Sequence, residues 1–285
     1  MAALVLAMPL AAQPRLMQGD VLALETPTLT VLDASGHQMS MSQSLPLYYG
    51  VYAPSPDRLW FGVGSDIFTM DDGEIKGPYL SDLKLHGVGT VSPMRGGDLL
   101  AGETFQSFFA AIVRFSQSGD VQAIYAVPAE HVSLGVDQVE SLFDPCVIAW
   151  TAWSRRVHAF DICERRELPD ILHVSESDGI VRALRQLPNG DFLMAAGSSV
   201  VRFSPTGVEK ARYPVQAYVL ALTPDARGFW SAGLDDEAHL IEFASPQTVV
   251  RVRLQNGAQS GLAVVGEWRA ALQPPPVSRR RSAGH

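Results

Sequence analysis

The chain is poor in the residues and motifs on which most recognisable chemistry depends. It has two cysteines, two asparagines and three lysines among 285 residues. It contains no G-x-S-x-G, H-E-x-x-H, C-x-x-C or P-loop sequence, which excludes the nucleophile, zinc and nucleotide sites that those motifs build. Both asparagines precede glycine, so there is no N-glycosylation sequon. We therefore expect no cofactor.

Basic charge is also scarce. The formal net charge is -8, and three of the arginines stand together in the tail at Arg279, Arg280 and Arg281, so the rest of the chain is more acidic still. Binding to phosphate backbones depends on clustered lysine and arginine, and this balance argues against a nucleic-acid partner.

Long apolar runs are absent too. No run reaches the roughly 18 apolar residues needed to cross a bilayer, although 47% of residues are hydrophobic. A soluble folded core without a transmembrane segment is expected. The apolar stretch from Met1 to Ala12 has two interpretations, a secretory signal that lacks its positive start or a strand of the fold. A cytoplasmic and an exported location both stay open.

The chain does contain a sequence repeat. In each copy, a polar turn and a short apolar strand are followed by a loop and a second strand that ends in Asp or Ser. Gly190–Ala195 leads in this way to Val200–Ser204, and Gly97–Ala101 leads to Ile112–Ser116. Further copies begin at Gly19, Arg58, Cys146 and Gly228, about 38 to 49 residues apart, which is the period of propeller blades. The sequence predicts an all-β fold, a single β-propeller of four-stranded antiparallel blades.

The ends of the chain decide the number of blades. A seventh repeat begins at Gly261–Val265 and stops after Gly266–Ala270, and Ala3–Met8 is positioned to complete it. We predict seven blades, or six if the ends close differently. The propeller domain is expected over residues 1–272, followed by a disordered Pro/Arg-rich tail at 273–285. Residues 129–143 break the rhythm and are expected to form a short helix or a long loop.

Three segments carry a resemblance to known families. They read SPDRLWFGVGSDIFTMDDG, LPNGDFLMAAGSSVVRFSPTG and TPDARGFWSAGLDDEAHLIEFAS. They resemble the β-propeller repeats of the YVTN, NHL and quinoprotein-like families, over about residues 15–272. The Trp-Asp dipeptide of WD-type repeats is absent. These families include enzymes, ligand binders and scaffolds, so the resemblance implies the fold and leaves the activity open.

The two cysteines flank a predicted hairpin. Cys146 begins the second strand of the fourth repeat, and Cys163 follows its third strand. A hairpin would bring them to the same end, where a disulfide, two separate thiols, or metal or redox chemistry are the alternatives. A disulfide would require an exported protein.

Candidate binding residues gather where the innermost strands begin. Tyr49, His86 and Tyr218 occupy these entrances, which face the central channel. The nearby loops carry Glu25, Asp66, Glu103, Asp235, Asp236 and Glu237. Such a channel mouth could hold a cation, another small ligand or a basic peptide, and the alternative is that these loops are simply solvated.

Aromatic residues suggest a neighbouring surface. Phe105, Phe108 and Phe109 lie in the longest second-to-third loop, and Trp150 and Trp153 lie in the equivalent loop of the next repeat. Exposed aromatics are candidate anchors for a protein partner, although they could instead cap the adjacent blade.

The leading functional interpretation is a non-enzymatic binding or assembly module, a scaffold that presents one face to a protein or small ligand. The alternative is a propeller enzyme, a metal-assisted hydrolase or lactonase. Its candidate residues would be His86, Glu103, Asp66 and Asp235, which no spacing forces together.

Overall fold

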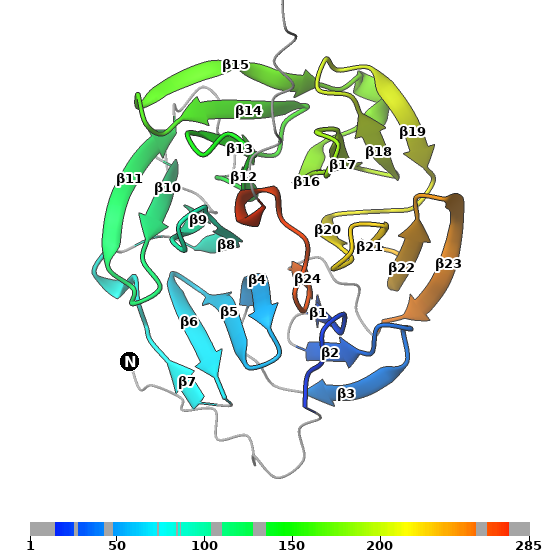
Figure 1. Cartoon of the computed structure of the whole chain (residues 1–285), viewed down its shortest axis with the longest axis horizontal. Helices are drawn as coiled ribbons and strands as arrows, with labels where there is room; N and C mark the ends of the chain where they lie inside the picture. Colours follow the sequence, from blue (N-terminus) through cyan, green and yellow to red (C-terminus); the bar gives the residue numbers. More distant parts are fainter. Residues whose placement is uncertain are drawn as a thin grey trace, which may run out of the picture.

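Six four-stranded antiparallel sheets are arranged around one centre in the computed structural model of the chain (Figure 1). The fold is the expected all-β propeller, with the alternative count of six blades. The structure describes residues 15–25, 28–42, 48–72, 74–83, 85, 87–103, 110–127, 135–254 and 261–273.

Blades 2 to 6 each take four consecutive strands of the chain, with the first strand innermost. Blade 2 contains β4 (Tyr48–Ser55), β5 (Arg58–Val63), β6 (Asp66–Asp71) and β7 (Glu74–Lys76). Blade 3 contains β8 (Val88–Pro93), β9 (Leu99–Glu103), β10 (Ala110–Phe115) and β11 (Val121–Val127). Blade 4 contains β12 (Gln138–Ser141), β13 (Val147–Thr151), β14 (Arg156–Asp161) and β15 (Arg166–His173).

The last two of these blades follow the same pattern. Blade 5 contains β16 (Val181–Gln186), β17 (Phe192–Ala196), β18 (Ser199–Phe203) and β19 (Glu209–Tyr213). Blade 6 contains β20 (Val219–Leu222), β21 (Gly228–Ala232), β22 (Glu237–Glu242) and β23 (Ser245–Arg253). The described residues also include three short 3-10 helices, Ser81–Leu83, Glu176–Asp178 and Ala270–Leu272. The described ranges contain no helix able to cross a membrane.

Blade 1 joins the two ends of the chain. Its innermost strand is β24 (Gly261–Val264), and β1 (Val21–Glu25), β2 (Thr28–Leu32) and β3 (Gln38–Ser42) complete it. β24 pairs antiparallel with β1, with Val264 opposite Val21 and Gly261 opposite Leu24. The segment expected to begin a seventh blade therefore completes the first one, because β1 would otherwise be an unpaired edge.

Two other expectations about the chain are answered in part. Residues 266–270 form a turn and the start of a 3-10 helix in place of a second strand, and residues 138–141 form β12 within the stretch expected to be a helix or loop. Ala3–Met8, expected to pair at the closure, and the tail from 274 onwards lie outside the described residues. Gln273 is described, and its carbonyl accepts a hydrogen bond from Arg95 Nη2 at 2.6 Å.

Each blade buries both of its faces against its neighbours. In β5, Leu59 and Phe61 pack toward blade 1, while Trp60 between them packs toward blade 3. This follows from the two-residue period of a strand, which sends successive side chains to opposite faces. The described residues form six such apolar clusters, one at each junction between adjacent blades. The core is therefore a ring of interfaces.

The innermost strands touch in the order β24, β4, β8, β12, β16, β20 and back to β24. At Gly50 in β4, an added Cβ would lie 2.6 Å from the Cα of Thr90 in β8, and the backbone φ is +61°. Glycine is needed there because only a residue without Cβ tolerates both this conformation and so close an approach.

Candidate binding site at the entrance face

The two ends of the ring differ. We call the end where innermost strands begin the entrance face, and the end where they finish the closed face. In blade 4, the start of β12 lies beside the end of β13, since Gln138 pairs with Thr151. Loops that follow the second strand of a blade therefore open on the entrance face.

A C-terminal segment, residues 265–273, lies at the centre of the ring, and we call it the clasp (Figure 1, red segment). It bonds to several blades: Gly266 N–H donates to Ala53 O at 2.8 Å, and Leu222 N–H donates to Glu267 Oε1 at 2.7 Å. The clasp thus connects blades 2 and 6 across the centre of the ring.

Four buried charges hold the clasp in place. Arg185 Nε donates to Glu267 Oε1 at 2.8 Å, and Arg269 Nη2 lies 2.8 Å from Glu267 Oε2. Arg269 also bonds to Glu140, and Arg185 lies 3.8 Å from the same carboxylate. Each of these side chains is at most 3% exposed. Burial raises the pKa of Glu140 against the opposing effect of the two arginines. Two cations and two anions make the group neutral, as a buried network requires.

The entrance face carries a cluster of aromatic and charged side chains drawn from three blades. We define the mouth cluster as Asp137, Trp153, Arg182 and Tyr218. The Cζ atom of Arg182 lies 3.4 Å from the ring centroid of Trp153 and 4.6 Å from that of Tyr218. Both distances are in the range of cation–π attraction. Arg182 Nη1 lies 3.6 Å from Asp137 Oδ2, and the backbone N–H of Trp153 donates to the same oxygen at 3.1 Å.

Local structure explains how these residues meet. Asp137 and Tyr218 directly precede the innermost strands β12 and β20, and Arg182 is the second residue of β16. Trp153 lies in the turn between β13 and β14, where it adopts a φ of +26°. That conformation is unusual for a non-glycine residue and is kept only where the surroundings impose it. The bridge between Ser154 and Val181 brings this turn beside blade 5.

The carboxyl group of Asp137 is electrostatically perturbed. Burial raises its pKa to about 6, although the Trp153 N–H and the Arg182 guanidinium both favour the ionised form. Its side chain is 13% exposed, compared with 15% for Arg182. Trp153 is 38% exposed and is the outermost of the large hydrophobic side chains in the cluster. The cluster thus offers an aromatic surface over a nearly buried ion pair.

The structure brings only some of the predicted site residues together. Trp153 and Tyr218 come together around Arg182, whereas Asp235 lies in the hairpin between β21 and β22 of the same face. Glu103 ends β9 and is buried, as is Glu25, so the alternative of simply solvated loops does not apply to these two carboxylates. Tyr49 belongs to β4, but its side chain lies outside the described part. His86, Phe105, Phe108 and Phe109 also lie outside it.

Three residues named for the enzyme alternative are described. Asp66, Glu103 and Asp235 belong to blades 2, 3 and 6 respectively, and no group of possible metal ligands within the described residues contains all three. Burial raises the pKa of Asp66. Asp235 instead lies near Glu237 and His239 of its own blade.

Sequence reasoning missed Asp137 and Arg182. Both occupy the entrances of innermost strands, the position at which Tyr49, His86 and Tyr218 were chosen. Asp137 was hidden by the irregular stretch before β12, which was expected to be a helix or loop. Aligning all six repeats on their innermost strands would have shown both residues.

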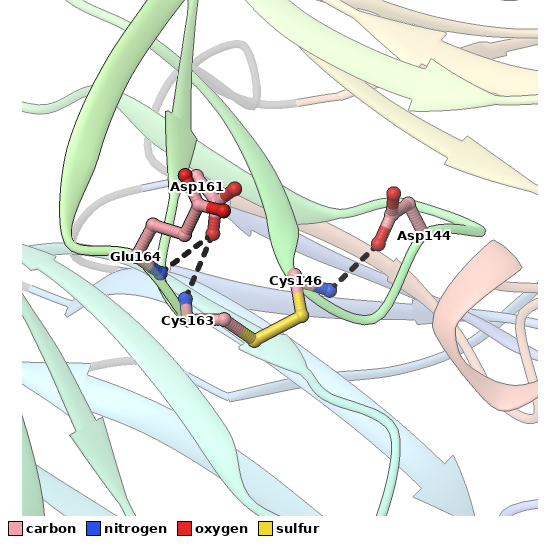
Figure 2. Close-up of a disulfide and its surroundings, with 5 residues drawn as sticks. All are labelled: Asp144, Cys146, Asp161, Cys163 and Glu164. Atoms are coloured by element: carbon pink, nitrogen blue, oxygen red, sulfur yellow. Dashed lines mark hydrogen bonds between the residues drawn. A yellow bond between two sulfur atoms is a disulfide. The ribbon is translucent and has the colours of Figure 1, made fainter.

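The two cysteines form a disulfide on the closed face (Figure 2). Their Cα atoms are 5.3 Å apart; Cys146 directly precedes β13, and Cys163 follows the end of β14 by two residues. Asp144 accepts a hydrogen bond from the Cys146 N–H, and Asp161 accepts from the Cys163 and Glu164 N–H groups (Figure 2). These contacts shape the turn on each side of the bridge.

Comparison with solved structures agrees with the fold. The chain is similar to a structure described as "Crystal structure of WD40 beta propeller domain of Doa1", with 14% identity and a TM-score of 0.58. The match covers 86% of this chain and 88% of that one. At this identity, the likeness concerns the β-propeller fold alone. The sequence matches no known protein family and no curated protein.

Proposed function

We propose that this chain is a non-enzymatic β-propeller binding or assembly module that presents its entrance face to a protein partner. The mouth cluster is the observation that carries this proposal. It combines Trp, Tyr and Arg, the three residue types most enriched among the energetically dominant residues of protein interfaces. Its ion pair is already desolvated, so a partner would pay little further desolvation there.

The fold adds support of a general kind. The β-propeller is typical of protein-binding WD40 domains, and this chain resembles a WD40 β-propeller in architecture. The repeats themselves are proposed to be of the YVTN, NHL or quinoprotein-like type, because the Trp-Asp dipeptide is absent from the whole sequence. The partner surface is proposed to extend to Phe105, Phe108 and Phe109, in the loop that joins β9 to β10. A small ligand or cation at the channel mouth, near Tyr49 and His86, stays part of the proposal.

The test begins with the protein as bait. Partners are cross-linked, identified by quantitative mass spectrometry, purified, and titrated against the protein by calorimetry. Trp153→Ala is expected to weaken binding at least tenfold, and Arg182→Lys is expected to weaken it less, because lysine keeps the charge but loses the planar stacking group. Adding Phe105→Ala, Phe108→Ala and Phe109→Ala to Trp153→Ala should abolish it.

The control is Val208→Ala, which truncates a 61% exposed apolar side chain in the turn between β18 and β19, on the closed face. Its affinity should match the wild type. Unchanged binding in a folded Trp153→Ala protein, or an equal loss in Val208→Ala, would contradict the proposal.

A further inference from the structure

Three potential metal ligands lie close together at the start of one strand of blade 6. Asp235 lies in the hairpin before β22, Glu237 is the first residue of the strand and His239 is its third. Because a strand sends every second side chain to the same face, Glu237 and His239 point in one direction, and the hairpin brings Asp235 beside them. Their ligand atoms all lie within 4.8 Å of one another. The geometry points to a zinc site on the entrance face, formed by Asp235, Glu237 and His239.

The distances are close to what zinc requires. His239 Nε2 lies 3.3 Å from Asp235 Oδ2 and 3.7 Å from Glu237 Oε2. Ligands about 2.0–2.1 Å from a tetrahedral zinc ion stand roughly 3.4 Å apart. Only the two carboxylates must move to reach this spacing, and their side chains are 28% and 29% exposed. Short rotations at the surface would suffice.

The buried side of the imidazole supplies a second, independent observation. The His239 side chain is 3% exposed, and its Nδ1 atom has no hydrogen-bond partner among the described residues. Ser231 lies directly opposite His239 in the β21–β22 ladder, and its buried hydroxyl has no partner in the described part of the chain either. The buried side of the ring therefore has a polar atom that no hydrogen bond holds in this structure.

Metal binding would give this atom a role. Zinc on Nε2 would leave the ring proton on Nδ1, and the hydroxyl of Ser231, opposite in the ladder, is the candidate acceptor for it. Histidine ligands in metal sites ordinarily donate their second N–H to such an outer group. Ser231 would act as a positioning residue that fixes the tautomer and orientation of the ring.

Competing interactions at the site are weak. Arg251 Nε lies 3.4 Å from Glu237 Oε2, but the arginine side chain is 64% exposed, and such surface pairs contribute little. Both cysteines of the chain are held in the disulfide, so no thiolate competes for zinc. One imidazole with two carboxylates suits zinc, whereas calcium takes six to eight oxygen ligands. Three protein ligands leave the fourth position for water.

The test uses the full-length, untagged protein, freed of metal with a chelator and titrated with zinc chloride by calorimetry. One ion should bind per chain, and cobalt in its place should give the visible absorption of a tetrahedral site. Asp235→Asn and His239→Gln should each weaken zinc binding at least tenfold. Ser231→Ala should weaken it less, without changing the stoichiometry.

A matched control exists elsewhere in the chain. His37 and Asp33 form another histidine–aspartate pair four residues apart with a 3.3 Å contact, but that imidazole is 84% exposed. The Asp33→Asn/His37→Gln protein should bind zinc as the wild type does. Circular dichroism in chelator checks that each variant is folded, and the partly exposed Asp235 keeps the test informative if His239→Gln does not fold. Absence of zinc binding in the wild type, or wild-type affinity in folded Asp235→Asn, would overturn the site.

Discussion

Asp191 and Arg202 form an ion pair that recurs in another blade as Asp98 and Arg114. In blade 5 the contact is 2.8 Å, and in blade 3 it is 2.7 Å. In both blades the aspartate precedes the second strand, and the arginine of the third strand reaches back to it. Burial of Asp191 would raise its pKa, but hydrogen bonds from Lys210, Asn189 and Arg202 outweigh this and lower it. The pair ties the start of one strand to the end of the next.

Asp137 provides the clearest prediction for a single side chain. Its pKa of about 6 in the folded protein exceeds the value of about 3.9 in an unfolded chain. The folded state therefore binds this proton more tightly, and the resulting stabilisation is present below pH 4 and is lost as the pH rises through about 6. Asp137→Asn cannot titrate. Between pH 4 and 7, the wild type should lose about 2 to 3 kcal/mol of unfolding free energy relative to this variant.

Urea denaturation at pH 4, 5, 6 and 7, followed by tryptophan fluorescence, measures the difference. Other carboxylates titrate equally in both proteins and cancel. Parallel pH curves for the two proteins would show that Asp137 has an ordinary pKa.

The β13–β14 hairpin is the one element of the described structure that is covalently closed. Cys146 and Cys163 stand 17 residues apart at its two ends. Disulfides form and persist mainly in oxidising compartments, so a lasting Cys146–Cys163 bond would require the exported alternative of the sequence analysis, which stays a prediction.

Removing the bridge should destabilise the protein. A crosslink over a loop of this size constrains the unfolded chain and contributes about 3 kcal/mol. Cys146→Ser/Cys163→Ser should lower the unfolding free energy by up to that amount, as measured by urea denaturation without reductant. Wild-type protein treated with reductant serves as the control and should coincide with the double variant. Alkylation of both thiols in the purified, unreduced protein would instead show that the bond does not form.

Closure of the whole ring depends on contacts between the ends of the chain. β24 supplies the innermost strand of blade 1, and the clasp beyond it enters the network of Glu140, Arg185, Glu267 and Arg269. The contributing residues come from blades 4 and 5 and from the clasp. Within the described strands, β1 is paired with β24 and is not left as an unpaired edge of blade 1. We expect loss of the clasp to destabilise the ring as a whole.

Arg269→Met tests this closure. The variant leaves two buried carboxylates facing one arginine, and breaking a buried ion pair in this way costs about 3 to 5 kcal/mol. The control is Arg269→Met/Glu140→Gln, which restores neutrality and should recover part of the loss. Thermal and urea denaturation compare the three proteins. A double variant no more stable than Arg269→Met would mean that charge balance at the closed face has little influence on the ring.

Much of the fold could be predicted from the sequence because its signals act over a few residues. Turns such as Leu187–Gly190 and the two-residue alternation of Leu59, Trp60 and Phe61 are local properties. The candidate site was only half predictable. Tyr218 was found at the entrance of an innermost strand and Trp153 as an aromatic residue of a loop, but Arg182, which joins them, is marked in the sequence only by its position at the start of an innermost strand.

By itself, then, the sequence determined the strands, their turns and the repeated blade, since each of these depends on neighbours along the chain. Only the tertiary structure decided that six blades close the ring, that the C-terminal strand completes blade 1, and that Asp137, Arg182 and Tyr218 share one mouth. The reason is geometric. These contacts join residues far apart in sequence, and they exist only once the number of blades brings the ends together around a common centre.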